Sequence, residues 1–518
     1  MTSLACTLSG DGATHKIIPH TSRWATMVPP QGLEPKDRFL GITPELDHTA
    51  ATQVEGFKRR IQELCDDYNA SPLGAEHCFD SRKIWQKMTG YLSDHAPDQK
   101  KVFRELETYH WDCNFELLGE TAMLLEDPEM EESEMEQVLD EKGEEMMKAI
   151  GGPARWVELP EGERLQLAKN LIRDAEICLG ERAWERLPEE LKEEMGCYWS
   201  GCGMHKDLNA VKGGVDRMSR WWEVAGKTPP IALMNKFKAG AGSSSEAGRS
   251  ERGGIKLTNL VGALVKHKDP KKGQQDRFRT FSRNNVGYEV HFPDTSNTRY
   301  QSHTRAATEI LCHPQLYLDF LTFLENTKTS TPGQLNHMEE NIRRGLLDKP
   351  TFTEIIVLAL YGEAFSAPFA RFLRSSKGKN GLDLGPDYDR FKQYLQNVID
   401  HPDLLIGPKI DSTTGTLDGL PWQNVDVIRK IEQSYLEYPD LAGALVAFFQ
   451  GALDKLEKFT EEFKKGSPIS MATPEQRWRS FRLLTNDKNE GSLGMCRLLY
   501  RRYSNIRFGQ LNAWLMCK

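Results

Sequence analysis

The hydrophobic pattern at the start of the chain predicts three short strands. An apolar run over residues 4–15 stops on Ser9-Gly10-Asp11-Gly12, which is typical of a buried strand that ends in a turn. Residues 17–28 and 39–42 are also rich in strand-forming side chains, and the Pro- and Gly-containing joints between the runs are short. Short joints suit antiparallel neighbours, so we expect these strands to pair in that way.

The pattern then changes to a helical period. Between residues 50 and 68 the apolar positions fall on one face, which predicts an amphipathic helix. Residues 84–92 predict a fourth strand that leads into Ser93-Asp94-His95, and a further helix begins near Pro97. The order strand, strand, strand, helix, strand is that of the ribonuclease H-like arrangement, in which the tips of the first and fourth strands lie side by side.

The rest of the chain is mostly helical in pattern. Residues 316–456 have helical spacing almost throughout, and a strand is expected at residues 286–291. We therefore expect an α/β protein with a ribonuclease H-like mixed sheet core that is interrupted by a large, mainly helical insertion. Acidic residues of the insertion, Glu354 and Glu363 among them, are expected on exposed helix faces.

This reading divides the chain into five segments. The first part of the core is expected at residues 1–115 and an acidic helical excursion at 116–195. The core continues over 196–310, the helical insertion occupies 311–480, and the last core helix lies within 481–518.

Composition sets the class of protein. The chain has 518 residues, of which 39% are hydrophobic and 27% charged, values typical of globular proteins with a substantial core. No apolar run is expected to reach membrane-spanning length, and the N-terminus lacks the basic and apolar regions of a secretory signal. Ten irregularly spaced cysteines indicate reduced thiols, as in a cytosolic or nuclear protein.

The formal net charge of -8 hides an uneven distribution. Residues 116–151 are strongly acidic and predict a solvated helix or flexible excursion. Residues 206–283 are basic, with Trp221 and Trp222 among the cations and a Gly/Ser-rich stretch at 240–254 that predicts a mobile loop. Basic and aromatic residues in alternation suit phosphate contact and base stacking, although a solvated surface with linkers explains them as well.

Three carboxylates stand where one site could collect them. Asp11 and Asp94 end predicted strands, and Glu490 falls in the first turns of a helix that starts near Asn486-Asp487. Each has a structural alternative: a turn for Asp11, a helix N-cap for Asp94, and for Glu490 a capping box with Asp487 as the cap.

Three carboxylates are what two-metal phosphoryl transfer requires. Two Mg²⁺ or Mn²⁺ ions about 4 Å apart need hard oxygen ligands. In this hypothesis Asp11 bridges both ions, and Asp94 and Glu490 each hold one.

A Cys-x-x-His pair, Cys202 and His205, could supply half of a Zn²⁺ site. The nearest further thiol is Cys197, and the sequence offers no convincing second pair. A packing or hydrogen-bonding role for Cys202 and His205 is therefore the interpretation we favour.

Four stretches carry a resemblance to a known group of proteins. They read Ser-Gly-Asp-Gly, Ser-Asp-His-Ala-x-Asp-Gln-Lys-Lys, Gly-Cys-Gly-Met-His-Lys-Asp-Leu-Asn and Asn-Asp-x-Asn-Glu-Gly-x-Leu-Gly. In this order the chain resembles fungal transposase-derived proteins of the Kyakuja, Dileera and Zisupton (KDZ) group and, more distantly, the hAT superfamily. These have a ribonuclease H-like DDE core with a helical insertion.

The resemblance implies roles for particular residues. Asp11, Asp94 and Glu490 would be the DDE triad, and Cys202 and His205 would match the Cys-x-x-His of hAT-like enzymes. Residues 299–302 would correspond to the family's Arg-Trp-Asn-Ser, with Tyr and Gln in place of Trp and Asn. The expected DNA-contacting residues are Lys206, Lys212, Arg299, Arg497, Arg501 and Arg502.

Two functional hypotheses follow. In the first, the chain is a DDE transposase or derived nuclease that cuts and joins DNA in the nucleus. In the second it is a catalytically silent relic, nuclear or cytoplasmic, that binds DNA or protein, because family members normally carry zinc- or DNA-binding modules ahead of the core. DNA is the expected partner and no membrane is expected; self-association stays open. A protein scaffold without a nucleic-acid partner is a third alternative.

Overall fold

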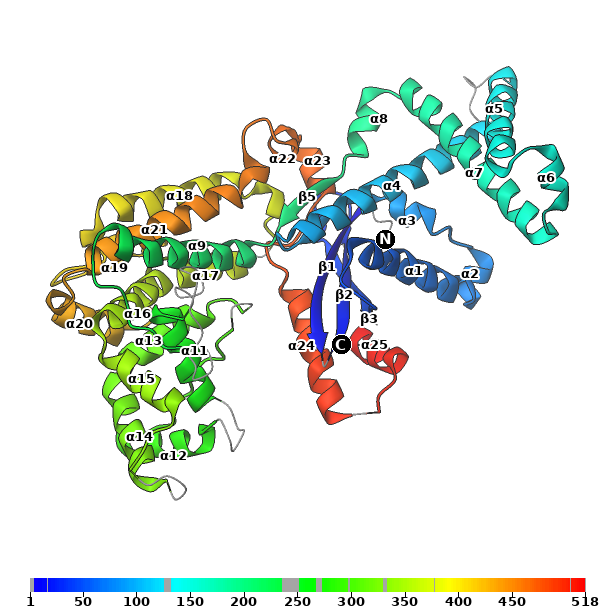
Figure 1. Cartoon of the computed structure of the whole chain (residues 1–518). Coiled ribbons are helices and arrows are strands. Elements are labelled where there is room, and N and C mark those ends of the chain that lie inside the picture. Colours follow the sequence, from blue (N-terminus) through cyan, green and yellow to red (C-terminus); the bar gives the residue numbers. More distant parts are fainter. Residues whose placement is uncertain are drawn as a thin grey trace. The chain divides into compact units, whose positions relative to one another are not determined.

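The computed structural model describes all residues except 1–3, 16, 125–131, 235–250, 267–272, 297–298, 329–332, 377, 504 and 518. The chain forms two compact units (Figure 1). The first, here the sheet unit, comprises Met1–Cys202, Gly378–Asp383 and Glu462–Lys518. The second, the helical unit, comprises Gly203–Lys377 and Leu384–Glu461, so this boundary falls within the segment expected as a continuation of the core.

The sheet unit is built on one five-stranded mixed sheet with the order β3-β2-β1-β4-β5. Its strands are β1 (Ala5–His15), β2 (Ile18–Val28), β3 (Lys36–Pro44), β4 (Met88–Ser93) and β5 (Tyr198–Gly201). The first three pair antiparallel, whereas β4 runs parallel to β1 and β5 parallel to β4. The expected α/β class and the first four strands are confirmed, and β5 was not expected.

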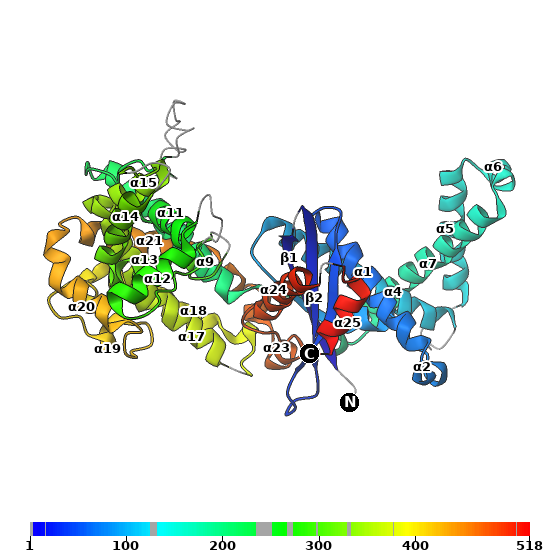
Figure 2. The ribbon, with the colours of Figure 1, turned by 90° about the horizontal axis from the view of Figure 1, so that it is seen from below.

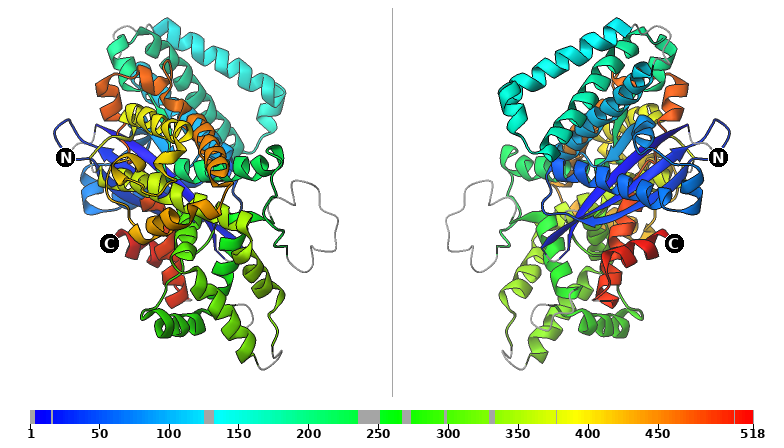
Figure 3. Two further views of the ribbon diagram at one scale, coloured as in Figure 1. Left: turned by 90° about the vertical axis from the view of Figure 1, so that its left-hand side faces the viewer. Right: turned by 90° about the vertical axis from the view of Figure 1, so that its right-hand side faces the viewer.

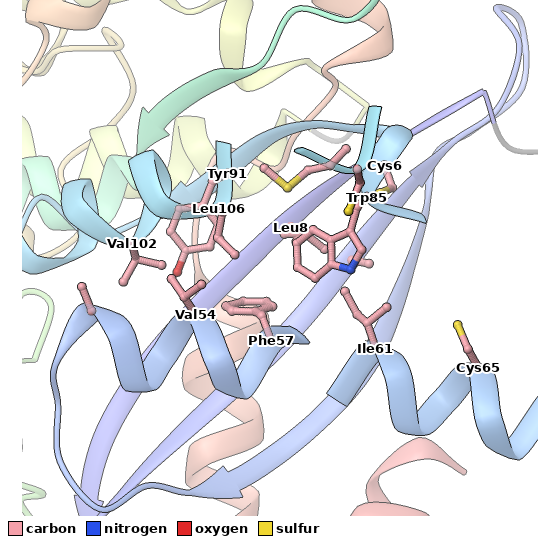
Figure 4. Packing of buried hydrophobic residues seen from close by; sticks show 14 residues of the cluster. Cys6, Leu8, Val54, Phe57, Ile61, Cys65, Trp85, Tyr91, Val102 and Leu106 are labelled. Carbon is pink, nitrogen blue, oxygen red and sulfur yellow. The ribbon is translucent and has the colours of Figure 1, made fainter. Parts of the chain in front are cut away.

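Side chains of β1 alternate between two buried faces of the sheet, as a strand period requires. Leu8 packs with Phe57 of α1 (Ala50–Asn69), and the same cluster includes Leu106 of α4 (Pro97–Met123) (Figure 4). Ser9 points to the other face, where α24 (Asp487–Arg502) and α25 (Phe508–Met516) pack on β1 to β3 (Figure 2).

A helical extension leaves the sheet after α4 (Figure 3). It consists of α5 (Glu132–Ile150), α6 (Pro153–Glu158), α7 (Glu161–Arg186) and α8 (Glu189–Glu194). α7 packs along α4 where Gly119 and Gly180 meet the opposite backbone, since a Cβ on either would lie 1.9 Å from a carbonyl oxygen of the other helix. Most described acidic residues of α5 are exposed or half-exposed, as expected for a solvated helix, and residues 125–131 of the acidic run lie outside the description.

Smaller elements complete the sheet unit. They are α2 (Pro72–Glu76), α3 (Arg82–Gln86), the 3-10 turns at Gly381–Asp383 and Glu461–Phe463 (the latter at the unit boundary), α22 (Pro468–Met471) and α23 (Pro474–Arg479).

The helical unit contains α9 (Gly203–Val224), α11 (Gly253–Val265), α12 (Gln275–Val286), α13 (Ser302–Cys312), α14 (Pro314–Thr327), α15 (His337–Leu347), α16 (Lys349–Tyr361), the π-helical turn η1 (Gly362–Ser366), α17 (Ala367–Ser375), α18 (Gly385–Asp400), α19 (Ser412–Gly415), α20 (Val425–Ser434) and α21 (Leu441–Lys458), with 3-10 turns at Pro402–Leu404 and Tyr435–Glu437. α9 packs closely against α21. The expected mainly helical character of this region is therefore observed.

Three expectations for the helical unit need correction. The predicted strand at 286–291 is wrong: α12 ends at Val286, and the next residues follow an irregular path in which Val290 N donates to Ser282 Oγ. Gly253 starts α11, so the end of the expected loop is helical, while residues 235–250 lie outside the description. Glu354 and Glu363 are buried rather than on exposed faces, because both accept hydrogen bonds inside the unit.

One helical run of the described chain, Lys349–Ser375, has 27 residues and is long and apolar enough to cross a membrane, contrary to the expectation that no run reaches that length. Of its most apolar window, 83% is buried inside the structure, against helices such as α11, α13 and α21.

Candidate carboxylate site at the strand tips

The parallel pairing of β1 and β4 ends close to two of the expected carboxylates. Its last pair is Ser9 with Leu92, and Asp11 and Asp94 each lie two residues further along the chain. The charges of both carboxylates raise the pKa of the Tyr91 phenol, so both lie near it. Asp11 Oδ1 accepts a hydrogen bond from Gly12 N at 2.9 Å, and Asp94 Oδ1 accepts one from Ala96 N at 2.9 Å. Both carboxyl groups are half-buried. Asp11 lies inside β1, which continues to His15, and pairs with Ser22 of β2, whereas Asp94 directly follows β4.

Two buried asparagines at the start of α24 form hydrogen bonds with Ser9 and Gly10 of β1. Asn486 Nδ2 donates to Gly10 O at 3.2 Å, and Asn489 Nδ2 donates to Ser9 Oγ at 3.0 Å. The two side chains are also joined by a hydrogen bond of 2.6 Å. Because helical residues three apart share a face, both asparagines can reach the same strand. Sequence analysis assigned no role to either, although their spacing was the available signal.

Contacts along α24 show which flank carries Glu490. Lys488 forms an ion pair with Asp37 of β3, so this flank faces the β2–β3 side. On the other flank Arg497 Nη2 donates to Thr14 O of β1 at 3.5 Å. Glu490 lies seven residues, or about two turns, before Arg497 and therefore shares its flank. The side chain is exposed alongside the strand that carries Asp11.

The capping-box alternative for Glu490 is not observed. The N-cap of α24 is Asn486, whose side chain makes no capping hydrogen bond, and Asp487 is already helical. For Asp94 the structural alternative is partly realised, since its carboxylate accepts from Ala96 N immediately before α4. A turn contact through one oxygen is compatible with ligand binding by the same carboxyl group.

The described residues do not form a complete metal-binding site. Among the residues that the structure describes, no three His, Cys, Asp or Glu side chains are grouped so that they could hold one ion. Asp11 and Asp94 thus lie beyond the last parallel pair of β1 and β4, and Glu490 lies on the flank of α24 that faces β1. The donor set, three carboxylates, is of the hard oxygen type that Mg²⁺ and Mn²⁺ prefer.

A chain of buried hydrogen bonds links Tyr91 of β4 to α4 and α1. Tyr91 Oη donates to Gln99 Oε1 at 3.0 Å, and Gln99 Nε2 donates to Gln53 Oε1 at 2.7 Å. Gln53 Nε2 continues the chain to the carbonyl oxygen of His48 at 3.0 Å. The pKa of the Tyr91 phenol is raised, first by burial, with the charges of Asp94 and Asp11 adding to the effect after the opposing influence of Arg23.

A buried arginine holds β5 in its place. Arg482 Nη1 donates to the main-chain oxygens of Tyr91 and Tyr198, at 3.2 and 2.9 Å, and so joins β4 to β5. Burial lowers the pKa of its guanidinium to about 10. Sequence analysis missed Arg482 because its sequence neighbours gave no sign that a cation at this position is buried.

Cys202 and His205 each have a partner of their own. Cys202 is buried, and its Sγ accepts from Asn486 N at 3.2 Å. His205 Nδ1 lies 3.0 Å from the Tyr300 hydroxyl. Neither belongs to a metal-type cluster within the described part of the chain, so the contacts favour the packing and hydrogen-bonding interpretation over half of a Zn²⁺ site.

The expected DNA-contacting residues differ in exposure. Lys206 has no exposed surface and its ammonium lies 5.3 Å from the centre of the Tyr388 ring, so the prediction of direct DNA contact is wrong for this residue. Arg299 is exposed but paired with Asp294 at 3.1 Å. The remaining predicted contacts are partly or fully exposed: Lys212, Arg497, Arg501 and Arg502.

Fold and site together define a mixed α/β protein in which Asp11 and Asp94 lie just beyond the last parallel pair of β1 and β4. Comparison with protein-family models, with curated proteins and with solved structures finds no match to the chain.

Proposed function

We propose that the chain is a ribonuclease H-like phosphoryl-transfer enzyme of the DDE type, resembling the KDZ and hAT-like transposases, that cleaves and joins DNA strands. The strand order β3-β2-β1-β4-β5, with an antiparallel first half and a parallel second half, supports this because ribonuclease H-like enzymes share it. The observation that carries the proposal is that Asp11 and Asp94 each lie two residues beyond Ser9–Leu92, the last parallel pair of β1 and β4.

In this proposal the three carboxylates divide the work. Asp11, between β4 and α24, contributes to both metal positions, and Asp94 and Glu490 contribute to one each. Bound Mg²⁺ or Mn²⁺ would supply a more acidic water and stabilise the departing oxygen. The hydrogen bonds from Gly12 N and Ala96 N orient the carboxyl groups of Asp11 and Asp94. On α24, the positively charged residues Arg497, Arg501 and Arg502 would contact the DNA phosphates.

A second candidate function is that of a catalytically silent relic that binds DNA or protein. One observation favours it: no group of three metal-type ligands is assembled among the described residues. In either case DNA is the proposed partner and the nucleus the proposed location. A relic that binds protein fits the cytoplasm equally well.

The deciding experiment is Mn²⁺-dependent nicking of supercoiled DNA by the purified chain. Asp94→Asn removes the charge of one proposed metal ligand, and Asp140→Asn, an exposed aspartate of α5, is the matched control. We expect nicking to fall at least about a hundredfold in Asp94→Asn and to persist in the control, with DNA binding kept in both. Binding without nicking in any form would support the relic. Equal nicking by both variants would overturn the enzyme proposal.

A further inference from the structure

A hollow of about 770 Å³ in the helical unit is lined by three elements. These are the irregular segment after α12, the end of α13 and one face of α20 from Asp426 to Gln433. A second hollow of about 410 Å³ adjoins it, because His291, Glu309 and Asn424 line both. Volumes of this size are in the range of small-molecule sites.

Glu309 of α13 stands at the junction of the two hollows without a hydrogen-bond partner among the described residues. Its side chain is 26% exposed, and His313 Nε2 lies 4.0 Å from Glu309 Oε1. His313 is in turn held by the Tyr288 hydroxyl at 2.9 Å. Arg305 lies one turn earlier on α13, but the described contacts include no ion pair between it and Glu309. Burial raises the pKa of Glu309 to about 7.

The other acidic groups around the hollow are already compensated. Glu363 accepts two hydrogen bonds from Asn424, through its main-chain N at 3.0 Å and its side chain at 2.6 Å. Glu289 pairs with Arg283. Asp426 pairs with Arg429 at 3.2 Å.

The cations of the larger hollow are occupied as well. Arg429 has Asp426, and Lys430 Nζ donates to the carbonyl oxygens of Leu311 and Cys312. Those oxygens belong to the C-terminal end of α13, whose partial negative charge suits an ammonium group. Within the described lining of the larger hollow, Glu309 is therefore the one carboxyl group without a hydrogen bond or a Lys or Arg partner.

We propose that this hollow binds an organic cation with N–H donors, a primary ammonium or a guanidinium, with Glu309 as its counter-ion and the rings of Tyr288 and His291 as its walls. A carboxylate supplies the charge-assisted hydrogen bond, and a phenol ring attracts a cation through its face. The inference concerns the helical unit alone and does not depend on the proposed strand-transfer activity.

Binding of a cation favours the ionised carboxylate, so it expels the proton that burial retains on Glu309 near neutral pH. Affinity should therefore rise between about pH 6 and pH 8. The other titratable or charged groups that line the larger hollow or interact electrostatically with Glu309 are Tyr288, Glu289, His291, Cys312, His313, Tyr317, Asp426, Arg429 and Lys430. Glu363, Arg305 and Lys266 line the adjoining hollow.

Calorimetric titration of the full chain with spermidine and with agmatine tests the proposal, with Mg²⁺ at matched ionic strength as the inorganic probe. Glu309→Gln keeps the shape of the side chain and removes its charge, and Asp426→Asn removes a paired charge from the same hollow. We expect affinity to fall about tenfold or more in Glu309→Gln and to change less than about twofold in Asp426→Asn. Proton release, measured in two buffers of different ionisation enthalpy, should vanish only in Glu309→Gln.

Three results would overturn the proposal. They are no saturable binding of either amine, equal binding by the wild type and Glu309→Gln, and equal competition by Mg²⁺, which would indicate an inorganic cation instead. A thermal melt of each variant confirms folding, and substitution of an unpaired buried carboxyl by its amide is not expected to unfold the unit.

Discussion

Gly10 lies one residue before Asp11, and the space that a side chain would fill there is taken. A Cβ at this position would lie 2.6 Å from the Tyr91 hydroxyl and 3.3 Å from the Phe57 ring. We expect Gly10→Ala to lower the free energy of unfolding by about 1–3 kcal/mol, because both neighbours are in a packed core. Urea unfolding measures it. Gly12→Ala is the control, since its nearest neighbour is 3.7 Å away.

A second variant distinguishes a clash between the new methyl group and the Tyr91 hydroxyl from a general loss of strand stability. In the Gly10→Ala background, Tyr91→Phe removes the hydroxyl that the new methyl group would meet. We expect the double variant to lose less stability than the sum of the two single variants. Strictly additive losses would show that the close approach of Gly10 and Tyr91 is not the reason.

At this scale the sequence located residues whose position follows from strand ends and missed those whose role depends on tertiary contacts. Asp94 directly follows β4, as the end of its apolar run predicted. The strand end predicted at Asp11 is wrong, because β1 continues to His15 and pairs Asp11 with Ser22 of β2. Lys206, Glu354 and Glu363 were expected at the surface because charged residues usually are. Their burial depends on partners far away in the sequence, such as Trp222 for Glu354, which no local pattern reveals.

Among the elements, α1 and α4 are joined below the strand tips by the Gln53–Gln99 hydrogen bond. Both side chains are buried, at 5% and 7% exposure. Gln99→Leu would leave Gln53 Oε1 and the Tyr91 hydroxyl without that partner, so we expect a loss of about 1–3 kcal/mol in the free energy of unfolding. Chemical denaturation measures the change.

Replacing both partners tests whether the loss arises from an unsatisfied group. The double variant Gln53→Leu/Gln99→Leu should lose less stability than the two single losses added together, because no glutamine is left facing an apolar side chain. Additive losses would place the effect in packing instead.

The direction of α24 makes a prediction about its two acidic residues. Both lie in the first turn, but Glu490, seven residues before Arg497, shares its flank beside β1, whereas Asp487, ten residues before Arg497, is rotated away from that flank. On the proposed function, Glu490→Gln should reduce Mn²⁺-dependent nicking at least about a hundredfold, and Asp487→Asn should leave it within about threefold. The opposite ranking would assign the third carboxylate to Asp487. An equally small effect of both would remove α24 from the site.

The elements that the sequence predicted well are those with a clear period and clear ends. The first four strands and α1 combine apolar periodicity with turn residues. β5 has only four residues and directly precedes the Cys-x-x-His motif, so its strand pattern is too short to recognise. The strand expected at 286–291 does not form, and Val290 N donates instead to Ser282 Oγ. Short elements depend on their neighbours in space, so periodicity alone decides them poorly.

For the molecule as a whole, buried carboxyl groups of the helical unit set an uncommon dependence of stability on pH. Burial raises the pKa of Asp207 to about 6 and the pKa values of Glu309 and Glu354 to about 7. Between their ordinary values near 4 and these values, the three carboxyl groups together hold more protons in the folded unit than in the unfolded chain. The contribution of these groups to stability is therefore complete below about pH 4, falls as the pH rises, and levels off above about pH 7.

The contribution of Glu309 to this decrease in stability with rising pH can be measured with Glu309→Gln, because the amide cannot ionise. We expect the wild type to melt several degrees lower at pH 8 than at pH 5.5, and Glu309→Gln to show a smaller decrease over the same interval. Glu289→Gln, which removes an acid paired with Arg283 beside the same hollow, should retain the wild-type dependence. If Glu309→Gln also retained it, the carboxyl group would already be ionised at pH 5.5. The protein would then keep an unpaired buried charge at neutral pH, and a cation would bind there without releasing a proton.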